Sequence, residues 1–512
     1  MTLMVTSNDA SAFSTAWRGV PLPEIKKNRK KMAWRLKEDK QDYFKNRRPK
    51  GFPPGPRGLP IVGNIFSVDQ NKTHESLTQF ARKYGNVYSI RMGQTWMVVL
   101  NSLEVLKEGL ITQGDSMVER PDVPLLDDVL HKQDLFSGKI WKQQRRFALS
   151  TLRHFGFGKK SLEQVVLDEF TNCAAYFSKY KGSLFNPQRI VTCMTSNIIC
   201  SIVFGHRFEY SDEKFVNLID MFDEAFQIQE SIWSKLYNSF PGVMRLLPGP
   251  HQTFLQIWES VKDFIREKIR EHKKTWDPSE PRDFIDCYLN EIEMNKEQND
   301  SDIFNEETLI GIALDLFSAG TETTSTTIRW AFLYMVKYPE IQEKVQAEID
   351  RVIGQYRQPS CDDRTKMPYT NAVIHEIQRI SNIVPLSVAH ATNKEVQLLD
   401  YTIPKGIVII PNLTSVLLDE NEWETPNTFN PGHFQNKEGE FVKRAAFLPF
   451  SAGKRACLGE NLAKMELFLF FTSFMQQFTF SMPAGVKPVM DYRFGITLSP
   501  QPFEICAQSR LN

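Results

Sequence analysis

The sequence predicts a mainly α fold with small β regions. Its 512 residues are 41% apolar and 24% charged, which is typical of a globular protein. Apolar residues recur with helical periodicity through most of the region from about 140 to 380. Short runs with strand character lie at about 86–101, 384–410 and 494–506. No change of composition marks a linker within these regions, so we expect one globular body.

The N-terminal region is predicted to precede that body as two segments. Residues 1–44 form an arm, and residues 45–66 are rich in proline, which fixes φ and cannot continue a helix. We therefore expect 45–66 to be a stiff, extended hinge and 67–512 to be the globular domain. Residues 23–50 contain twelve Lys or Arg against four Asp or Glu, a net charge of +8.

Charge and cysteine content exclude several classes of protein. The net charge of the chain is +1, which argues against a protein that binds nucleic acid. The seven cysteines are odd in number and contain no Cys-x-x-Cys pair, so we expect a reducing compartment and no disulfide framework. No N-terminal run approaches the roughly 18 apolar residues that a membrane span requires. The apolar stretch 467–475 is better explained as a core helix.

The first predicted elements of the body are two short strands within residues 86–101, which turn at Gly93. Valine and isoleucine, which favour strands, mark the later β regions. These signals centre on Val388, Val396, Ile403 and residues 407–410.

A long apolar run in the middle of the chain predicts a buried helix. Asp315, Ala319 and Thr323 are four residues apart and therefore share one face of it. An acid next to an alcohol, as in Glu322 and Thr323, could deliver protons to bound oxygen. A core helix with an exposed glutamate explains the same segment and is the simpler interpretation of the segment alone.

The most informative motif is residues 450–459, Phe-Ser-Ala-Gly-Lys-Arg-Ala-Cys-Leu-Gly. Gly453 and Gly459 would allow the backbone to approach a flat partner closely. Cys457 directly precedes a predicted helix, whose N-terminus would lower the pKa of the thiol. A free thiolate is usually a nucleophile or a metal ligand, and Arg455 could pair with an anionic group on the bound partner.

Two further pairs are weaker signals. Glu376 and Arg379 lie three residues apart on a predicted helix, a spacing that is common on helix surfaces. Trp141 and Arg145 lie one turn apart and could bond a carboxylate, although a buried tryptophan beside a solvated arginine explains them as well.

The loop resembles the haem-binding signature of the cytochrome P450 superfamily, with Phe450, Gly453, Arg455, Cys457 and Gly459 in place. The resemblance implies a P450-like fold with a buried haem b, whose iron has Cys457 as its axial thiolate. A thiolate ligand favours O–O cleavage.

The same resemblance assigns roles to the other motifs. Glu322 and Thr323 become the acid and alcohol of oxygen activation. Glu376 and Arg379, with His433, become a buried network that supports the cysteine loop. The implied haem contacts are Trp141, Arg145, His390, Arg455 and, more weakly, Arg120. The implied substrate contacts are Asp315, Ala319, Val384, Val388 and Ile496.

Residues 141–163 and 494–498 are most similar to the animal microsomal second family, in particular its branch that oxidises polyunsaturated fatty acids and xenobiotics. The resemblance implies insertion of one atom of O₂ into an apolar substrate, with electrons from NADPH through a flavin reductase or, as a second donor, a b-type cytochrome. The basic residues expected to dock such a donor are Lys142, Arg146, Lys443, Arg444 and Lys454.

The family's usual place is the cytosolic face of the endoplasmic reticulum membrane, held by a hydrophobic anchor. Residues 1–44 do not resemble that anchor, so we expect either peripheral attachment through 23–50 or an atypical start. Two other functions remain open: a haem-thiolate isomerase or dehydratase that needs no O₂, and a haem-binding protein without catalytic activity.

Overall fold

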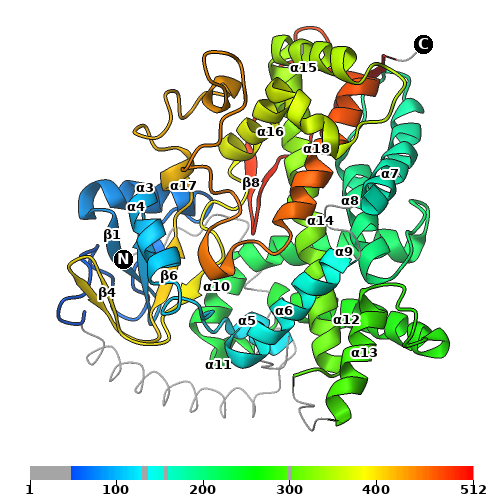
Figure 1. The fold of residues 1–512 in the computed structure, drawn as a ribbon. Helices are drawn as coiled ribbons and strands as arrows, with labels where there is room; N and C mark the ends of the chain where they lie inside the picture. Colours follow the sequence, from blue (N-terminus) through cyan, green and yellow to red (C-terminus); the bar gives the residue numbers. More distant parts are fainter. Residues whose placement is uncertain (1–47, 130–136, 155–159, 298–302, 511–512) are drawn as a thin grey trace.

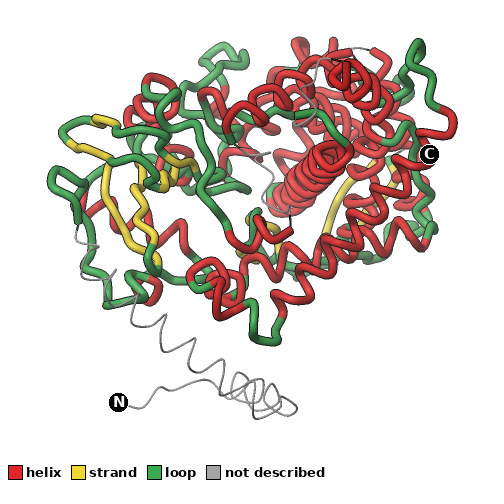
Figure 2. The backbone as a smooth tube through the Cα atoms, turned by 90° about the horizontal axis from the view of Figure 1, so that it is seen from below, coloured by secondary structure: helices red, strands yellow, loops and turns green. Residues whose placement is uncertain are grey.

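The computed structural model describes residues 48–129, 137–154, 160–297 and 303–510. The predicted arm, residues 1–44, lies outside the described residues. The described chain has a β-rich part and a larger helical part, which lie on opposite sides of the molecule (Figures 1 and 2). This arrangement is the mainly α fold with small β regions that the sequence predicts.

The main sheet has four strands in the order β1-β2-β6-β3. β1 (Val87–Met92) and β2 (Thr95–Leu100) are antiparallel, as predicted for residues 86–101, and β2 is parallel to β6 (Val408–Pro411). β3 (His390–Ala391) adds to β6. Val388, which was expected in a strand, lies outside the strands and is 57% exposed.

Three two-stranded sheets complete the β structure of the described residues. They are β4 (Val396–Leu398) with β5 (Tyr401–Ile403), β7 (Phe478–Ser481) with β10 (Cys506–Ser509), and β8 (Tyr492–Phe494) with β9 (Leu498–Pro500). β7 was not predicted, because it continues directly from an apolar helix. The helices are α3 (Thr73–Tyr84), α4 (Leu103–Lys107), α5 (Pro124–Val129), α6 (Gly138–His154), α7 (Lys160–Ser178), α8 (Gln188–Val203), α9 (Glu213–Glu230), α10 (Ile232–Ser239), α11 (Pro241–Met244), α12 (Pro250–Thr275), α13 (Phe284–Glu297), α14 (Glu306–Lys337), α15 (Pro339–Val352), α16 (Pro368–Ser381), α17 (Thr414–Leu417) and α18 (Glu460–Gln477).

The described part of the proline-rich hinge runs along β1. The Ser89 N–H donates to the Pro54 carbonyl at 2.6 Å, and the Asn64 N–H donates to the Arg91 carbonyl at 2.6 Å. These bonds satisfy backbone groups that an edge strand would otherwise expose. Residues 53–64 are therefore packed on the body of the protein.

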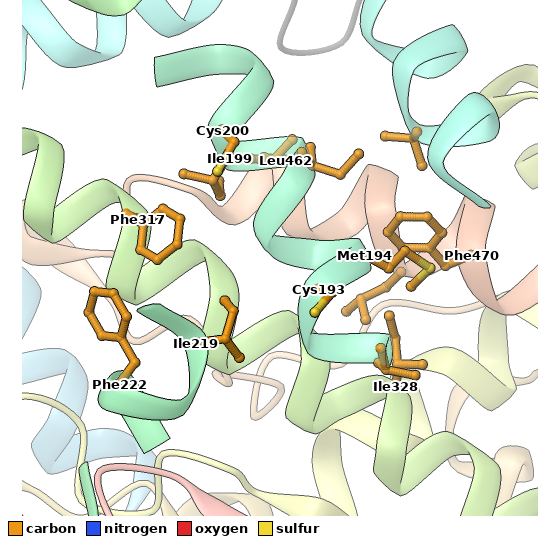
Figure 3. Close-up of a cluster of buried hydrophobic side chains, with 14 of the residues drawn as sticks. Cys193, Met194, Ile199, Cys200, Ile219, Phe222, Phe317, Ile328, Leu462 and Phe470 are labelled. Carbon is orange, nitrogen blue, oxygen red and sulfur yellow. The ribbon is translucent and has the colours of Figure 1, made fainter. Parts of the chain in front are cut away.

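α14 is the long central helix of the molecule (Figure 1). It begins with a capping box, in which Asn305 and Thr308 satisfy each other's backbone N–H groups. Further along, it packs against α8, α12, α16 and α18. Figure 3 shows α8 in contact with both neighbours: its Met194 and Ile199 lie among side chains of α14, such as Ile328, and of α18, such as Leu462 and Phe470.

Glu376 and Arg379 form a fully buried ion pair on α16. Arg379 donates two hydrogen bonds of 2.7 Å, one to each carboxylate oxygen of Glu376. His433, in the short helix η5 (Pro431–Phe434), lies 3.2 Å from the same carboxylate, and the Asn430 N–H donates to it at 2.9 Å. The network holds α16 against the segment that leads to the cysteine loop.

Gly453 begins the short helix η6 (Gly453–Arg455) of the cysteine loop and has a φ of +74°. A Cβ atom at this position would lie 1.9 Å from the carbonyl oxygen of Leu110 in η2 (Glu108–Thr112). The glycine at this position therefore permits a close approach to the backbone of η2.

Replacing Glu376 by Gln should lower the free energy of unfolding by about 3–5 kcal/mol, because the Arg379 charge would stay buried without a counter-charge. Chemical denaturation of the haem-loaded protein measures the change. Asp220→Asn is the matched control, since it breaks the exposed Arg189–Asp220 pair and should cost only about 0–1 kcal/mol. Equal losses in the two variants would contradict this account.

Gly453→Ala should destabilise the protein more than Gly439→Ala does. Gly439 has a φ of +79°, and a Cβ atom there would have no neighbour within 4 Å, so its alanine variant carries backbone strain of only about 1–2 kcal/mol. Gly453→Ala adds the collision with Leu110, which should cost a further amount of about 1–3 kcal/mol. The melting temperatures and haem contents of the two variants provide the comparison, and a Gly453 variant no worse than its control would contradict the prediction.

Candidate functional site

Cys457 lies in the loop between η6 and α18. Its N–H donates to the Phe450 carbonyl at 3.0 Å, which closes the loop on itself. All seven cysteines fall within the described residues, and Cys457 alone is exposed. The other six are buried or half-buried, as small apolar residues usually are. Cys457 is thus the most accessible residue among the seven cysteines.

The environment of the Cys457 thiol contains opposing influences. Burial among surrounding protein atoms raises its pKa, and the nearby Glu460 carboxylate also raises it. The N–H groups of Gly459 and Glu460 hydrogen-bond to the thiol and lower the pKa, as does the charge of Arg145. The net pKa is raised, so our expectation of a lowered pKa is wrong for the protein alone: burial outweighs the helix terminus, and α18 begins only at Glu460. A thiolate here therefore depends on a bound cation, which deprotonates a coordinating thiol.

Positively charged side chains gather around this loop. The Arg455 guanidinium lies over the Trp141 ring, 3.3 Å from its centroid, and its Nε donates to the Val118 carbonyl at 2.8 Å. Arg145, one helical turn after Trp141 on α6, donates to the Ala456 carbonyl at 2.6 Å. The structure thus brings the predicted Trp141, Arg145 and Arg455 together.

Arg120 and His390 join the same cluster. Arg120 donates to the carbonyls of Val388 and Ala389 at 2.8 and 2.7 Å, and His390 Nδ1 lies 2.7 Å from the Met117 carbonyl. Burial lowers the pKa of Arg120 to about 10 and that of His390 to about 4.

The charges of this cluster repel one another. Burial lowers the pKa of Arg455 to about 9, and the charge of Arg120 contributes to that shift; the charge of Arg145 in turn lowers the pKa of Arg120. Three guanidinium groups held this close favour an anionic ligand, which would relieve their repulsion.

The predicted acid and alcohol on α14 do not pair with each other. The Thr323 hydroxyl donates to the Ala319 carbonyl at 2.9 Å. The Glu322 carboxylate accepts hydrogen bonds from Thr326 at 3.0 Å and from Thr497 at 2.6 Å. Successive helix residues point about 100° apart, so the Glu322 and Thr323 side chains leave the helix in different directions.

Glu322 instead lines a polar cavity of 370 Å³ bounded by α8, α9 and α14. Thr321, Ser318 and the buried Arg329 line the same cavity. Its volume is sufficient for several water molecules. Glu322 can therefore contact water in this cavity, although it makes no hydrogen bond to the Thr323 hydroxyl.

The predicted substrate contacts come from three segments. Ala319 is exposed although α14 is largely buried around it, which indicates a hollow beside the helix at this point. Val384 and Ile496 are half-buried. A hydrogen bond of 3.3 Å from the Ser387 hydroxyl to that of Ser451 ties the segment 384–388 to the cysteine loop. Asp315 lies one turn before Ala319 on α14, and burial raises its pKa to about 7.

The sequence analysis missed two residues that contact the α14 segment. Thr497, in the turn before β9, bonds Glu322, and Glu466 on α18 is buried beside Thr324. A signal for Glu466 was present, since it is an acid inside an otherwise apolar helical run.

The basic residues expected to dock an electron donor have different environments. Lys454 pairs with Asp115, and Arg444 pairs with Glu424. Lys142 and Arg146 line an open cleft of 520 Å³ on α6 together with Arg145, Leu149, Ser150 and Arg153. The basic residues that line this cleft are therefore more available to a docking partner than Lys454 and Arg444, which already pair with acids.

Within the part of the chain that the structure describes, every helix is too short or too polar to cross a membrane.

Comparison with known proteins agrees with this site. The model of the Cytochrome P450 family matches residues 53–507. The chain is 50% identical to human cytochrome P450 2J2 over 468 residues, which cover 91% of this chain and 93% of the relative. It is 49% identical to cytochrome P450 2J1 of Oryctolagus cuniculus over 470 residues, with 91% and 93% covered. Identity to cytochrome P450 2C23 of Rattus norvegicus is 44% over 466 residues, with 90% and 94% covered.

A match of this length and identity, over a fold with an accessible cysteine among buried cations, shows the family. The chain belongs to the animal microsomal second family of the cytochromes P450: it is a haem-b monooxygenase with a cysteine-thiolate iron ligand, which takes electrons from NADPH through a reductase and inserts one atom of O₂ into an apolar substrate.

Proposed function

We propose that Cys457 is the residue that supplies the thiolate to the haem iron. Its exposure, unique among the seven cysteines, carries this assignment. Gly459 and Glu460 support it, since their N–H groups point at the sulfur and would stabilise its negative charge. Haem b, when bound, supplies an iron centre that activates O₂, and thiolate ligation favours O–O cleavage. Phe450 and Gly453 would hold the loop in the conformation that presents the sulfur.

The cationic cluster would hold the two haem propionates. Arg120, Arg145 and Arg455 are fixed by hydrogen bonds to backbone carbonyls, so their charges are in place before the anion arrives. Trp141 supports Arg455 by stacking, and His390, neutral at pH 7, can accept or donate a hydrogen bond. The buried Glu376–Arg379–His433 network would keep the segment before the loop rigid.

On α14, Thr323 and Glu322 would each take part in proton delivery in turn, without a hydrogen bond between them. Thr323 would hold a proton at Oγ1 on the substrate side of α14. Glu322 would exchange protons with water in the 370 Å³ cavity, so that its carboxylate connects the helix to solvent.

Asp315, Ala319, Val384, Val388 and Ile496 would line the substrate site. Four of the five are apolar, which suits a fatty acid of the arachidonic type or an apolar xenobiotic. Asp315 adds a constraint, because its pKa of about 7 leaves it partly ionised at neutral pH. A fatty acid should therefore bind with its carboxylate away from Asp315, whereas a cationic group near Asp315 is favourable.

The electron donor would dock on the positive cleft of α6. Lys142 and Arg146, which line this cleft, and Lys443 would attract an acidic reductase or a b-type cytochrome. Lys454 and Arg444 would contribute less, since each already has an acidic partner. We place the enzyme at the cytosolic face of the endoplasmic reticulum, where each basic residue of segment 23–50 near anionic lipid would add about 1 kcal/mol.

Replacement of Cys457 tests the haem assignment. Cys457→Ala should abolish the red-shifted Soret band of the ferrous carbonyl complex, because that band requires a thiolate ligand. Cys361→Ala is the matched control, since Cys361 is half-buried and distant in sequence, and should leave the band intact. Retention of the band in the Cys457 variant would overturn the assignment.

The titration of Asp315 tests the substrate site. Affinity for dodecyltrimethylammonium, whose charge does not titrate, should rise by up to about tenfold between pH 6 and pH 8 as Asp315 ionises, and affinity for dodecanoate should fall. Haem difference spectra give both affinities, with dodecanol as the neutral control. Asp315→Asn should remove both trends; if the trends persist in that variant, Asp315 does not face the ligand.

A further inference from the structure

Ile496 lies at the tip of the hairpin formed by β8 and β9, between the β-rich part and the helical part of the protein (Figure 1). The Gly495 N–H donates to the Thr497 carbonyl at 3.1 Å, so residues 495–497 form a tight turn. The position of Ile496 is therefore set by whatever holds the two strands on either side of this turn.

The strand that follows the turn, β9, is bound to the helical part. The Trp330 side chain of α14 donates its N–H to the Leu498 carbonyl at 2.8 Å, and the Leu498 N–H donates to the Ile383 carbonyl at 2.8 Å. The Thr497 hydroxyl, which belongs to a buried residue, donates to the Glu322 carboxylate of α14 at 2.6 Å. These bonds fix one side of the hairpin.

The strand that precedes the turn, β8, has different partners, which come from α3. Tyr492 and Phe494 are two residues apart in the strand and therefore point to the same face. The Tyr492 hydroxyl donates to the Glu75 carboxylate at 2.8 Å. The His74 ring is parallel to the Phe494 ring, with an interplanar angle of 2° and 5.8 Å between the ring centroids, and its centroid lies 5.7 Å from that of Tyr492. Two adjacent residues of α3 thus contact the two side chains that β8 turns toward them.

His74 acts in this contact as a neutral, packed ring. It is 5% exposed, and burial lowers its pKa, so the imidazole is uncharged at pH 7. The charged neighbours Glu75 and Lys72 shift this pKa in opposite directions. The Nδ1 atom of His74 has no hydrogen-bond partner among the described residues. The ring therefore contributes to the structure through its contacts with the aromatic side chains of β8.

α3 is itself fixed on the main sheet. Leu77 of α3 packs in a buried cluster with Tyr88 and Val99, and the Tyr88 hydroxyl donates to the Leu77 carbonyl at 2.8 Å. The Asn412 side chain, directly after β6, donates to the Thr78 hydroxyl at 3.0 Å. Because α3 is held by the sheet, its contacts with β8 set the distance between the hairpin and the β-rich part.

We propose that His74 and Glu75 are positioning residues for substrate selectivity, which hold β8 against α3 and thereby fix the place of Ile496 beside the substrate. This inference rests on the proposed role of Ile496 in lining the substrate site. With β9 held by α14 and β8 held by α3, loss of either attachment displaces the turn between them. A long apolar chain senses such a displacement, because a gap of about 0.5–1 Å removes a quarter to a half of a van der Waals contact.

The experiment measures the ratio of the oxygenated isomers that the haem-loaded enzyme forms from arachidonic acid with its reductase. This acid has double bonds at different distances from its carboxylate, so displacement of an apolar wall changes which position is oxidised. The ratio does not respond to partial unfolding, because every active molecule contributes to all the isomers. A residue that only stabilises the fold would therefore leave it unchanged.

Two variants remove the contacts, and two conservative variants restore them. His74→Ala removes the ring that packs on Phe494, and Tyr492→Phe removes only the hydroxyl that donates to Glu75. Each should change the isomer ratio by about threefold, which is within the range expected for one aromatic pair or one coupled contact. His74→Phe keeps a ring and Glu75→Gln keeps a hydrogen-bond acceptor, so both should retain the wild-type ratio.

A double variant tests whether the hydrogen bond is the cause. Glu75→Ala should change the ratio as Tyr492→Phe does, and the two changes together should have no larger effect than either alone, because both remove the same bond. If His74→Ala does not give the normal ferrous carbonyl spectrum, Tyr492→Phe and Glu75→Ala decide the question.

Tyr84→Ala is the matched control. Tyr84 lies at the other end of α3, where its ring centroid is 6.4 Å from that of Tyr88 in β1, so the variant removes an aromatic contact of the same helix away from the hairpin. Its isomer ratio should equal that of the wild type. Equal changes in Tyr84→Ala and His74→Ala would overturn the proposal, as would an unchanged ratio in correctly folded His74→Ala or Tyr492→Phe.

Ile496→Ala is the reference variant. If it leaves the isomer ratio unchanged, the proposed substrate role of Ile496 fails, and His74 and Glu75 cannot act through it. If Ile496→Ala changes the ratio while His74→Ala and Tyr492→Phe do not, the role of Ile496 stands and the inference on α3 fails alone.

Discussion

The packing of α14 against α8 and α18 is the constraint on which the site depends. At Gly320 a Cβ atom would lie 2.4 Å from the Ile199 side chain of α8, so this side chain occupies the space that the glycine leaves free. The Thr195 hydroxyl of α8 donates to the Thr321 carbonyl of this turn, and the Thr497 hydroxyl donates to the Glu322 carboxylate. A helix held this tightly can present a hydroxyl at a reproducible position, which proton delivery requires.

The protein contains two kinds of buried charge, and they have different purposes. In the Glu376–Arg379 pair, each buried charge has a partner of opposite charge inside the protein. The pair therefore helps to hold the segment before the cysteine loop in place. In the cluster of Arg120, Arg145 and Arg455 like charges crowd together, which helps to lower the pKa of Arg120 and of Arg455. An anion beside this crowded cationic cluster would relieve the repulsion, and a cluster of like charges of this kind is typical of a binding site.

Several site residues were predictable because their motifs are local. The Cys457 loop is ten residues long, and the relation between Trp141 and Arg145 needs only the helical repeat. The pairing of Glu376 with Arg379 follows from the same repeat, although its complete burial does not. The direction of the Glu322 side chain could not be predicted from its position next to Thr323, because Thr497, 175 residues later, donates a hydrogen bond to it.

The sequence by itself determined the fold class, the family and the loop of Cys457, since these depend on periodicity and on short motifs. Only the tertiary structure decided the protonation of the groups in the site. The pKa of Cys457 is raised although the N–H groups that follow it lower it, and burial raises the pKa of Glu466 to about 8, a shift that its place in an apolar run does not by itself give. The reason is that desolvation depends on all the atoms packed around a group, and those atoms come from helices far apart in the chain.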